Sequence, residues 1–318
     1  MKKILIIGSI NMDMIAEVDH TPVAGETILT NSVELVPGGK GANQAYAVGR
    51  LGGNVTFLGA VGRDSYGRIE KENLRKAGVN VSPVIEKEGI STGIAFITVN
   101  KDGDNAIVVA SGANMTLSQK EIEENILLIE QCDIVILQME IPVETVIFAA
   151  KKAKELGKTV ILDPAPVPLE FPEELYRYLD IIKPNETELK MLTGLGESME
   201  ELEMAADILK KKGVANVVVT LGGNGVYIDP EQGNNQKIPA LKVEVEDTTA
   251  AGDTFTAAMA LKIAQGEKLE DAVRYANYAS ALVVTKKGAQ PSIPGRDEVE
   301  KFIEEMISRT DPAARFVS

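Results

Sequence analysis

The sequence predicts an α/β fold: a doubly wound, mostly parallel sheet flanked by helices, with a second, small antiparallel β-sheet. Three observations support this prediction. Continuous apolar runs recur along the 318 residues, as in strands that are covered on both faces. Helical patterns alternate with these runs. Two β-rich stretches with turn residues interrupt the alternation, and they predict the small sheet.

The apolar runs define the strands of the main sheet. We expect strands at residues 3–8, 55–58, 134–137, 159–162, 180–182 and 217–221. Helical patterns separate or follow them, at 41–51, 67–77, 118–131, 143–156, 187–192, 199–212, 252–265, 269–284 and 296–309. This alternation is typical of a parallel sheet with helices on both faces.

The small sheet is predicted from residues 14–36 and 92–110. The first stretch is half-polar, with Pro22 and Gly25 as turn residues, and the second has β-rich runs at 93–99 and 106–110. Between these two runs, residues 100–103 (Asn-Lys-Asp-Gly) are typical of a hairpin turn. We expect this small sheet to be inserted in a body made of residues 1–13, 37–91 and 111–309, and residues 310–318 to form a frayed tail.

Composition and charge exclude several classes of protein. The 33 Lys and Arg residues stand against 47 Asp and Glu, so the formal net charge is −14. This charge disfavours nucleic acid as a partner, and an anionic ligand would need a local cationic patch. The single cysteine, Cys132, and the single histidine, His20, exclude an intramolecular disulfide, a cysteine-based zinc site and a His-rich metal site. Since we find neither a signal sequence nor a run of about 18 apolar residues, we expect a cytoplasmic protein with no membrane contact.

A glycine-rich segment, residues 37–45, precedes a helix of small residues near the N-terminus. Its glycines would let the backbone approach a polar or anionic group closely, and Lys40 adds a cation, but the segment taken alone favours a tight turn before a packed helix. Asn11 and Asp13 follow the first strand, at the edge where open α/β sheets bind ligands. If the chain stays extended there, both side chains face the same way and suit a polyhydroxylated ligand. The alternative is a surface turn.

The segment 247–255 carries the strongest chemical signal. Ala250, Ala251 and Gly252 would leave the amides at a helix N-terminus uncovered, which forms a cup for developing negative charge. Asp253 lies in the first turn of that helix, where its carboxylate could accept a proton from an attacking hydroxyl. The alternative interpretation is that Asp253 only stabilises the helix dipole.

Two further segments follow predicted strands. In 184–188 (Pro-Asn-Glu-Thr-Glu), Glu186 or Glu188 could hold Mg²⁺ through water, unless the segment is only a helix N-cap with acidic residues in its first turn. Residues 220–225 form a glycine turn that suits close backbone contact with a nucleotide, or an ordinary loop.

Eight motifs occur in order along nearly the whole chain: GSINMD (8–13), GGKGANQA (38–45), STG (91–93), QMEIP (138–142), PNETE (184–188), TLGGNG (220–225), DTTAAGDTF (247–255) and KKGAQPSIP (286–294). Each motif alone is weak. Their shared order and spacing make the sequence resemble the PfkB/ribokinase family of sugar and nucleoside kinases. The resemblance implies transfer of the γ-phosphoryl group of ATP to the 5-hydroxyl of D-ribose, which gives D-ribose 5-phosphate.

The resemblance also implies roles for individual residues. Asp253 matches the catalytic base of the family, and Ala250, Ala251 and Gly252 match its anion hole. The positions that match sugar contacts are Asn11, Asp13, Gly39, Lys40, Asn43 and Glu140. Those that match nucleotide contacts are Asn185, Thr220, Gly222, Gly223 and Gly225, with Asn277 as a further candidate beside the adenine.

Metal ions and a partner subunit are implied in the same way. Glu188 matches the acidic residue linked to Mg²⁺, and a loop pair that surrounds K⁺ in the family, partly through backbone carbonyls, corresponds to Asp247, Thr249, Val283, Lys286, Gly288 and Ser292. The small sheet resembles the family's lid, which also pairs two subunits, so we expect a homodimer. Imperfect alternation of the apolar residues in 93–99 agrees with a sheet face that a second subunit covers, and the alternative is a lid that faces only its own domain.

Two residues depart from the family pattern: Thr256 stands where Asn is usual, and Asp163 stands in a turn that often begins with Asn. Neither is assigned to the reaction. The nearest alternative is a related kinase for another sugar or a nucleoside, and a second is a catalytically silent ATP- and sugar-binding module, which an intact Asp253 disfavours. An NAD-linked dehydrogenase would require the G-x-G-x-x-G fingerprint, which is absent.

Overall fold

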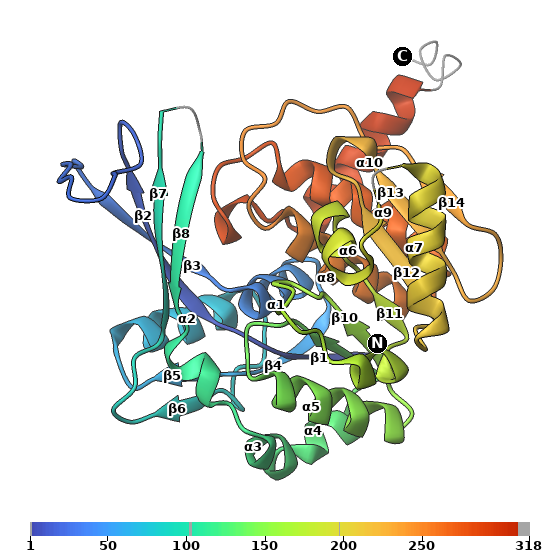
Figure 1. The fold of residues 1–318 in the computed structure, drawn as a ribbon, viewed down its shortest axis with the longest axis horizontal. Coiled ribbons are helices and arrows are strands. Elements are labelled where there is room, and N and C mark those ends of the chain that lie inside the picture. The colour runs from blue at the N-terminus through green and yellow to red at the C-terminus, as the bar shows by residue number, and fades with distance from the viewer. Residues whose placement is uncertain (1, 102–103, 197, 311–318) are drawn as a thin grey trace.

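A computed structural model describes residues 2–101, 104–196 and 198–310 (Figure 1). Its main sheet has the strand order β14-β13-β12-β11-β10-β9-β1-β4. The strands are β1 (Lys3–Ile7), β4 (Asn54–Leu58), β9 (Ile134–Leu137), β10 (Thr159–Leu162), β11 (Ile181–Ile182), β12 (Asn216–Thr220), β13 (Val226–Asp229) and β14 (Gln236–Ile238). Pairing is parallel from β4 to β12 and antiparallel from β12 to β14, which confirms the doubly wound, mostly parallel sheet.

Helices cover both faces of this sheet because its central strands are apolar on both sides. In β1, Ile4 and Ile6 pack into one core cluster, and Leu5 and Ile7 pack into the other. The first cluster lies under α1 (Lys40–Arg50), α2 (Ser65–Lys76), α8 (Ala251–Ala264), α9 (Leu269–Val283) and α10 (Arg296–Thr310). The second lies under α3 (Gln119–Glu124), α4 (Ile126–Gln131), α5 (Val143–Glu155), α6 (Glu186–Thr193) and α7 (Met199–Lys211). Among the helices described, none is both long and apolar enough to span a bilayer.

The predicted helices begin and end within two residues of the observed ones, with one exception. The helix expected over 118–131 is two helices, α3 and α4, separated by Asn125. The Asn125 side-chain amide donates a hydrogen bond to the Glu121 carbonyl (2.9 Å), and this contact ends α3. Short 3₁₀ turns, which were not predicted, cover Gly112–Thr116, Glu173–Tyr178, Gly222–Asn224 and Gln290–Ser292.

A four-stranded sheet projects from this body (Figure 1). Its order is β3-β2-β7-β8, with β2 (Asn11–Glu17), β3 (Val33–Gly38), β7 (Gly93–Val99) and β8 (Asn105–Ala110). The two outer pairs are antiparallel as predicted, whereas the central pair of β2 and β7 is parallel. A further parallel pair, β5 (Ala60–Gly62) and β6 (Ile85–Lys87), was not predicted.

The small sheet includes residues on both sides of the expected domain boundaries, since β2 begins at Asn11 and β3 ends at Gly38. The division of the chain at residues 13 and 37 therefore stays a prediction. The middle of the expected hairpin turn, residues 102–103, and the tail beyond residue 310 lie outside the described residues.

Candidate active site

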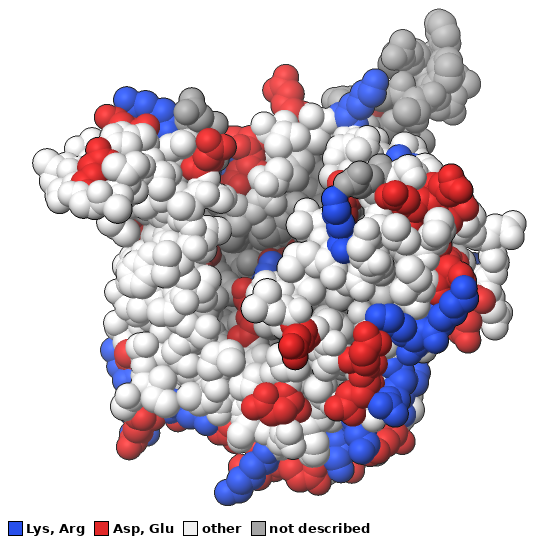
Figure 2. Space-filling view, in the orientation of Figure 1, with Lys and Arg blue, Asp and Glu red and all other residues white. Residues whose placement is uncertain are grey.

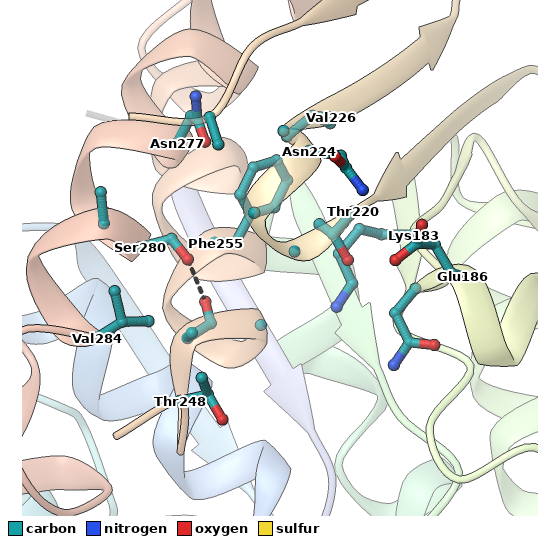
Figure 3. Close-up of a pocket in the computed structure, with 18 of the residues that line it drawn as sticks. Lys183, Glu186, Thr220, Asn224, Val226, Thr248, Phe255, Asn277, Ser280 and Val284 are labelled. Carbon is teal, nitrogen blue, oxygen red and sulfur yellow. Dashed lines mark hydrogen bonds between the residues drawn. The ribbon is translucent and has the colours of Figure 1, made fainter. Parts of the chain in front are cut away.

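A cavity of about 1230 Å³ lies at the carboxyl edge of the main sheet. Figure 3 shows Lys183 and Glu186 on one side of it and Ser280 and Val284 on the other. Figure 2 shows the molecule hollowed between the small sheet and the helical body, with charged side chains on the floor of the hollow. Of the predicted site residues, those that line the cavity are Lys40, Asn185, Glu188, Thr220, Gly222, Gly223, Gly225, Ala250, Ala251, Gly252, Asp253 and Asn277.

Asp253 lies at the junction of this cavity with the base of the small sheet. Its side chain is buried, and its two carboxyl oxygens accept hydrogen bonds from Asn43 Nδ2 (3.0 Å) and Gln44 Nε2 (3.2 Å) on α1. Burial raises the pKa of Asp253 to about 6, although the Lys40 ammonium acts in the opposite direction. A carboxylate with this pKa is ionised at neutral pH and can still accept a proton.

The N-terminus of α8 has a backbone suited to bind an anion. Its N-cap residue, Ala250, is left-handed (φ 62°) and makes no side-chain capping bond. An L-residue in this conformation costs roughly 1–2 kcal/mol. Within the described residues, the amides of Gly252 and Asp253 donate no hydrogen bond, whereas the Ala251 amide makes a long one to the Thr248 carbonyl (3.3 Å). Two unpaired amides therefore point out of a helix N-terminus beside Asp253.

Asn11 and Asp13 lie on one face of β2, as the two-residue spacing predicts, and both are buried. Asn11 Oδ1 accepts a hydrogen bond from Asn114 Nδ2 (2.7 Å), so its own amide group is free to turn towards a ligand. Burial, and then the charges of Glu140 and Asp253, raise the pKa of Asp13 to about 7. An ionised Asp13 has unused acceptor positions for hydroxyl groups.

Two glycines allow the backbone to pass between these side chains. A Cβ on Gly38 would lie 2.2 Å from Asp13 Oδ2, and one on Gly39 would lie 2.8 Å from the Asn11 amide nitrogen. Gly39 also has φ 87°, which side-chain-bearing residues rarely adopt. Close approach is therefore the physical reason for glycine at both positions.

Lys40 and Glu140 complete the floor of the site. The Lys40 amide donates to Glu140 Oε2 (3.1 Å), which also accepts a hydrogen bond from the Ser9 hydroxyl. Burial lowers the pKa of Lys40, but the carboxylates of Asp253, Asp163, Glu140 and Glu188 together raise it above its ordinary value. Lys40 is thus a permanent cation among acidic groups.

The segment 184–188 begins α6 with a capping box. Asn185 Oδ1 accepts from the Glu188 amide, and Glu188 Oε2 accepts from the Asn185 amide, both at 2.8 Å. The capping interpretation of this segment is therefore confirmed. Burial and then the charge of Asp163 raise the pKa of Glu188. Glu188 lines the cavity and its second oxygen accepts no hydrogen bond from the described residues, and oxygen donors of this kind suit Mg²⁺ bound through water.

The other residues predicted to contact nucleotide surround the far side of the cavity. Thr220 bridges to Asn185 where β12 ends, and Gly222 and Gly223 follow in a 3₁₀ turn. Gly225 (φ 97°) packs against β14, because a Cβ there would lie 2.0 Å from the Ile238 carbonyl oxygen. Asn277 on α9 donates to the Pro239 carbonyl (2.9 Å). These residues form a backbone-lined pocket large enough for a nucleotide.

Asp247 joins the two loops that match the family's K⁺ loops by resemblance. Its carboxylate accepts from the Thr249 amide (2.9 Å) and hydroxyl (2.6 Å), and from the Gly288 amide (2.8 Å). The Lys286 side chain instead pairs with Glu298, so Lys286 can contribute only its backbone carbonyl. Of the remaining two positions, Val283 ends α9 and Ser292 donates to the Ala289 carbonyl. The described residues contain no group of three or more His, Cys, Asp or Glu placed to hold a metal ion.

Comparison with known proteins agrees with this geometry. A family model described as pfkB family carbohydrate kinase matches residues 1–296. The chain belongs to this family. It is 39% identical over 304 residues to the ribokinase of Haemophilus influenzae (95% of this chain and 99% of the relative) and 34% identical over 302 residues to a deoxyribokinase of Salmonella typhi (94% and 98%). A structure of Arabidopsis thaliana ribokinase complexed with ribose and ATP superposes with a TM-score of 0.90 at 36% identity, covering 95% of this chain and 99% of that one.

Several residues of this kinase site were not predicted from the sequence. Gln44 and Gln290 hold Asp253 directly or through Asn43, and Asn114 holds Asn11. Gln44 and Gln290 lie within two of the motifs described above, whereas Asn114 and Glu70 lie outside all of them. The Glu70 carboxyl on α2 is fully buried near Asp13 and has no hydrogen-bond partner of ordinary geometry among the described residues.

Proposed function

We propose that this chain transfers the γ-phosphoryl group of ATP to the 5-hydroxyl of D-ribose, giving D-ribose 5-phosphate and ADP. The observation that carries the proposal is the position of Asp253. Its carboxylate lies between the buried polar group of Asn11, Asp13 and Asn43 and a cavity large enough for a nucleotide. A base at that junction reaches a sugar hydroxyl and the outermost phosphate together.

Each residue then has one task in the transfer. Asp13 accepts hydrogen bonds from the sugar hydroxyls, and the Asn11 amide group donates hydrogen bonds to them. Together these contacts orient the sugar. Asp253 takes the proton of the 5-hydroxyl as the new O–P bond forms and the bond to the β-phosphate breaks. The amides of Gly252 and Asp253, with Ala251 once its long bond to Thr248 gives way, stabilise the charge on the transferred group.

Two metal ions belong to the proposal. Mg²⁺ would be held by Glu188 through water, and when bound it neutralises charge on the nucleotide phosphates. K⁺ would lie between the loops that Asp247 joins, and Thr249, Val283, Lys286, Gly288 and Ser292 would surround it. These residues fit K⁺ because they offer oxygen donors, and because the Asp247 carboxylate already holds both loops through the Thr249 and Gly288 amides. These loops precede α8 and follow α9, so K⁺ would stiffen the anion hole without touching substrate.

The small sheet has the two roles expected of a lid. One face carries Asn11 and Asp13 and would close over the sugar, which excludes water as a competing acceptor. The other face carries a row of apolar side chains in register, Leu35, Met14, Phe96 and Val108. Phe96 and Val108 are 49% and 68% exposed, so we propose that a second copy of the chain covers this face in a homodimer. A cytoplasmic location is part of the same proposal.

A kinase for a related sugar is the second candidate, because the Salmonella deoxyribokinase is also a relative. The test measures ADP release with ribose, 2-deoxyribose, fructose and adenosine, each with K⁺ and with a large organic cation in its place. We expect ribose to give the highest kcat/KM and the organic cation to abolish most of the activity.

The role of Asp253 is tested in the same assay. Asp253→Asn keeps the size of the side chain and removes the base, so kcat should fall by about 10²–10⁴-fold while ribose still binds. An Asp253→Asn enzyme that turns over within a few-fold of the unchanged protein would contradict the assignment. ADP release that no sugar stimulates would contradict the proposed function itself.

A further inference from the structure

A buried ion pair lies at the centre of the carboxyl edge of the main sheet. Asp163 follows β10 and Lys183 follows β11, and the parallel register of these strands (Leu162 opposite Ile182) makes the two residues neighbours. Lys183 Nζ and Asp163 Oδ2 are 3.0 Å apart, and the two side chains are 4% and 3% exposed. Lys183 therefore holds its charge almost out of water.

The Lys183 ammonium faces the proposed anion hole. Its nitrogen lies 3.4 Å from the point where a Cβ on Gly252 would stand, so the absence of a side chain at residue 252 leaves the ammonium beside the unpaired amides. Both residues line the nucleotide cavity, in which Figure 3 labels Lys183. The cation and the amides thus converge on one volume.

Stability alone is a poor explanation for this pair. A buried ion pair is often no more stabilising than a neutral pair of similar size, since both charges lose their hydration. Asp163 is also more constrained than an ordinary partner, because the same oxygen accepts from Gln44 (3.0 Å) and lies 3.4 Å from the Thr256 hydroxyl, which makes its shorter bond to the Gly252 carbonyl (3.0 Å). These contacts fix Asp163, and Asp163 in turn fixes the direction of the Lys183 side chain.

We propose that Lys183 is a further catalytic residue, whose ammonium contacts an oxygen of the transferred phosphoryl group while Asp163 positions it. This inference rests on the proposed kinase function. In the transfer, the sugar oxygen forms a bond to the γ-phosphorus, the bond to the bridging oxygen breaks, and ADP leaves with that electron pair. The hydroxyl proton goes to Asp253, and Lys183 keeps its protons throughout.

The deciding variant removes both charges together. Asp163→Asn with Lys183→Met preserves side-chain size and leaves no unpaired buried charge. We expect kcat to fall about 10–100-fold, which corresponds to about 1.4–2.7 kcal/mol of transition-state stabilisation. The dissociation constant for ADP should change less than threefold, whereas that for the non-hydrolysable analogue β,γ-imido-ATP should rise at least tenfold, because only the analogue carries the γ-phosphate.

A matched control removes an ion pair outside the cavity, Lys210 with Asp229 (2.7 Å), through Lys210→Met and Asp229→Asn. This control should keep kcat and both nucleotide affinities. If the Asp163/Lys183 double variant does not fold, Lys183→Arg, which keeps the charge, should retain more activity than Lys183→Gln. Equal activity of those two variants, or an unchanged kcat in the double variant, overturns the inference. If the unsubstituted protein phosphorylates ribose, either of these results contradicts only the role of Lys183 and not the proposed kinase function. If the unsubstituted protein is inactive, the proposed kinase function itself is wrong.

Discussion

Acidification should inactivate this enzyme in two steps, because two buried carboxyls must be ionised at once. Asp13 must accept hydrogen bonds from the sugar and Asp253 must accept its proton, and their pKa values are raised to about 7 and about 6 by burial and by neighbouring charges. Since kcat/KM reports ionisations of the free enzyme, both groups should appear in its pH profile. The two carboxyls interact, so the apparent values belong to the pair.

The size of the effect follows from these pKa values. At pH 5 both carboxyls lie below their pKa values, and ionisation of Asp13 alone would be limited to about 1 molecule in 100, so kcat/KM for ribose should be at least about 10²-fold below its plateau. The profile is measured from pH 5 to pH 9 by direct quantification of ribose 5-phosphate, with circular dichroism at each pH to confirm the fold. Asp13→Asn lowers the plateau but should leave a fall of at most about tenfold at pH 5. A kcat/KM that is constant between pH 8 and pH 5 would refute the assigned roles.

Two other predictions concern residues away from the reacting groups. Burial and then the charge of Asp13 raise the pKa of Glu70 well above its ordinary 4.5, so the folded state binds this proton more tightly than the unfolded chain. The folded state therefore loses stability as the pH rises above about 4.5, where the unfolded chain releases this proton more readily. Glu70→Gln should raise the melting temperature at pH 8 more than at pH 5. An equal shift in melting temperature at both pH values would contradict this prediction. On the apolar face of the small sheet, Val108→Glu should convert the dimer to a monomer, as measured by light scattering. The control Met204→Glu, at an exposed position on α7, should leave the dimer intact. If the Val108→Glu protein is still a dimer, this face of the small sheet is not the interface.

The main sheet could be predicted because its strands are apolar on both faces. A continuous apolar run such as 134–137 is stable only as a strand buried on both faces, and β9 coincides with that run. The antiparallel hairpin of β13 and β14 escaped prediction, because its strands are only four and three residues long and Gln236–Ile238 is mostly polar. Position at an edge, rather than local composition, makes this segment a strand.

The site was predictable where function depends on local backbone. The left-handed Ala250, the positive φ of Gly39 and the capping box at Asn185 all lie within short motifs. Contacts between distant segments were not predictable in this way. Asn43 and Asp253 are 210 residues apart, and Asp163 and Lys183 meet only because β10 and β11 are neighbours in the sheet. A strand order is needed before such a pair can be recognised.

The strand order also resolves a conflict between net charge and substrate. A chain with a net charge of −14 repels polyphosphate at long range, and the cavity floor itself gathers the carboxylates of Asp163 and Asp253. Lys183 is buried beside Asp163, and the half-buried Lys40 lies near the same carboxylates, so each ammonium acts over a few ångströms in a medium where charge interactions are stronger than in bulk water. Asp163 in turn holds the Lys183 ammonium in place before ATP arrives. We therefore expect attraction for phosphate to depend on the nearby lysines and on the amides of α8, with the acidic surface contributing little, because solvent and salt screen distant charges.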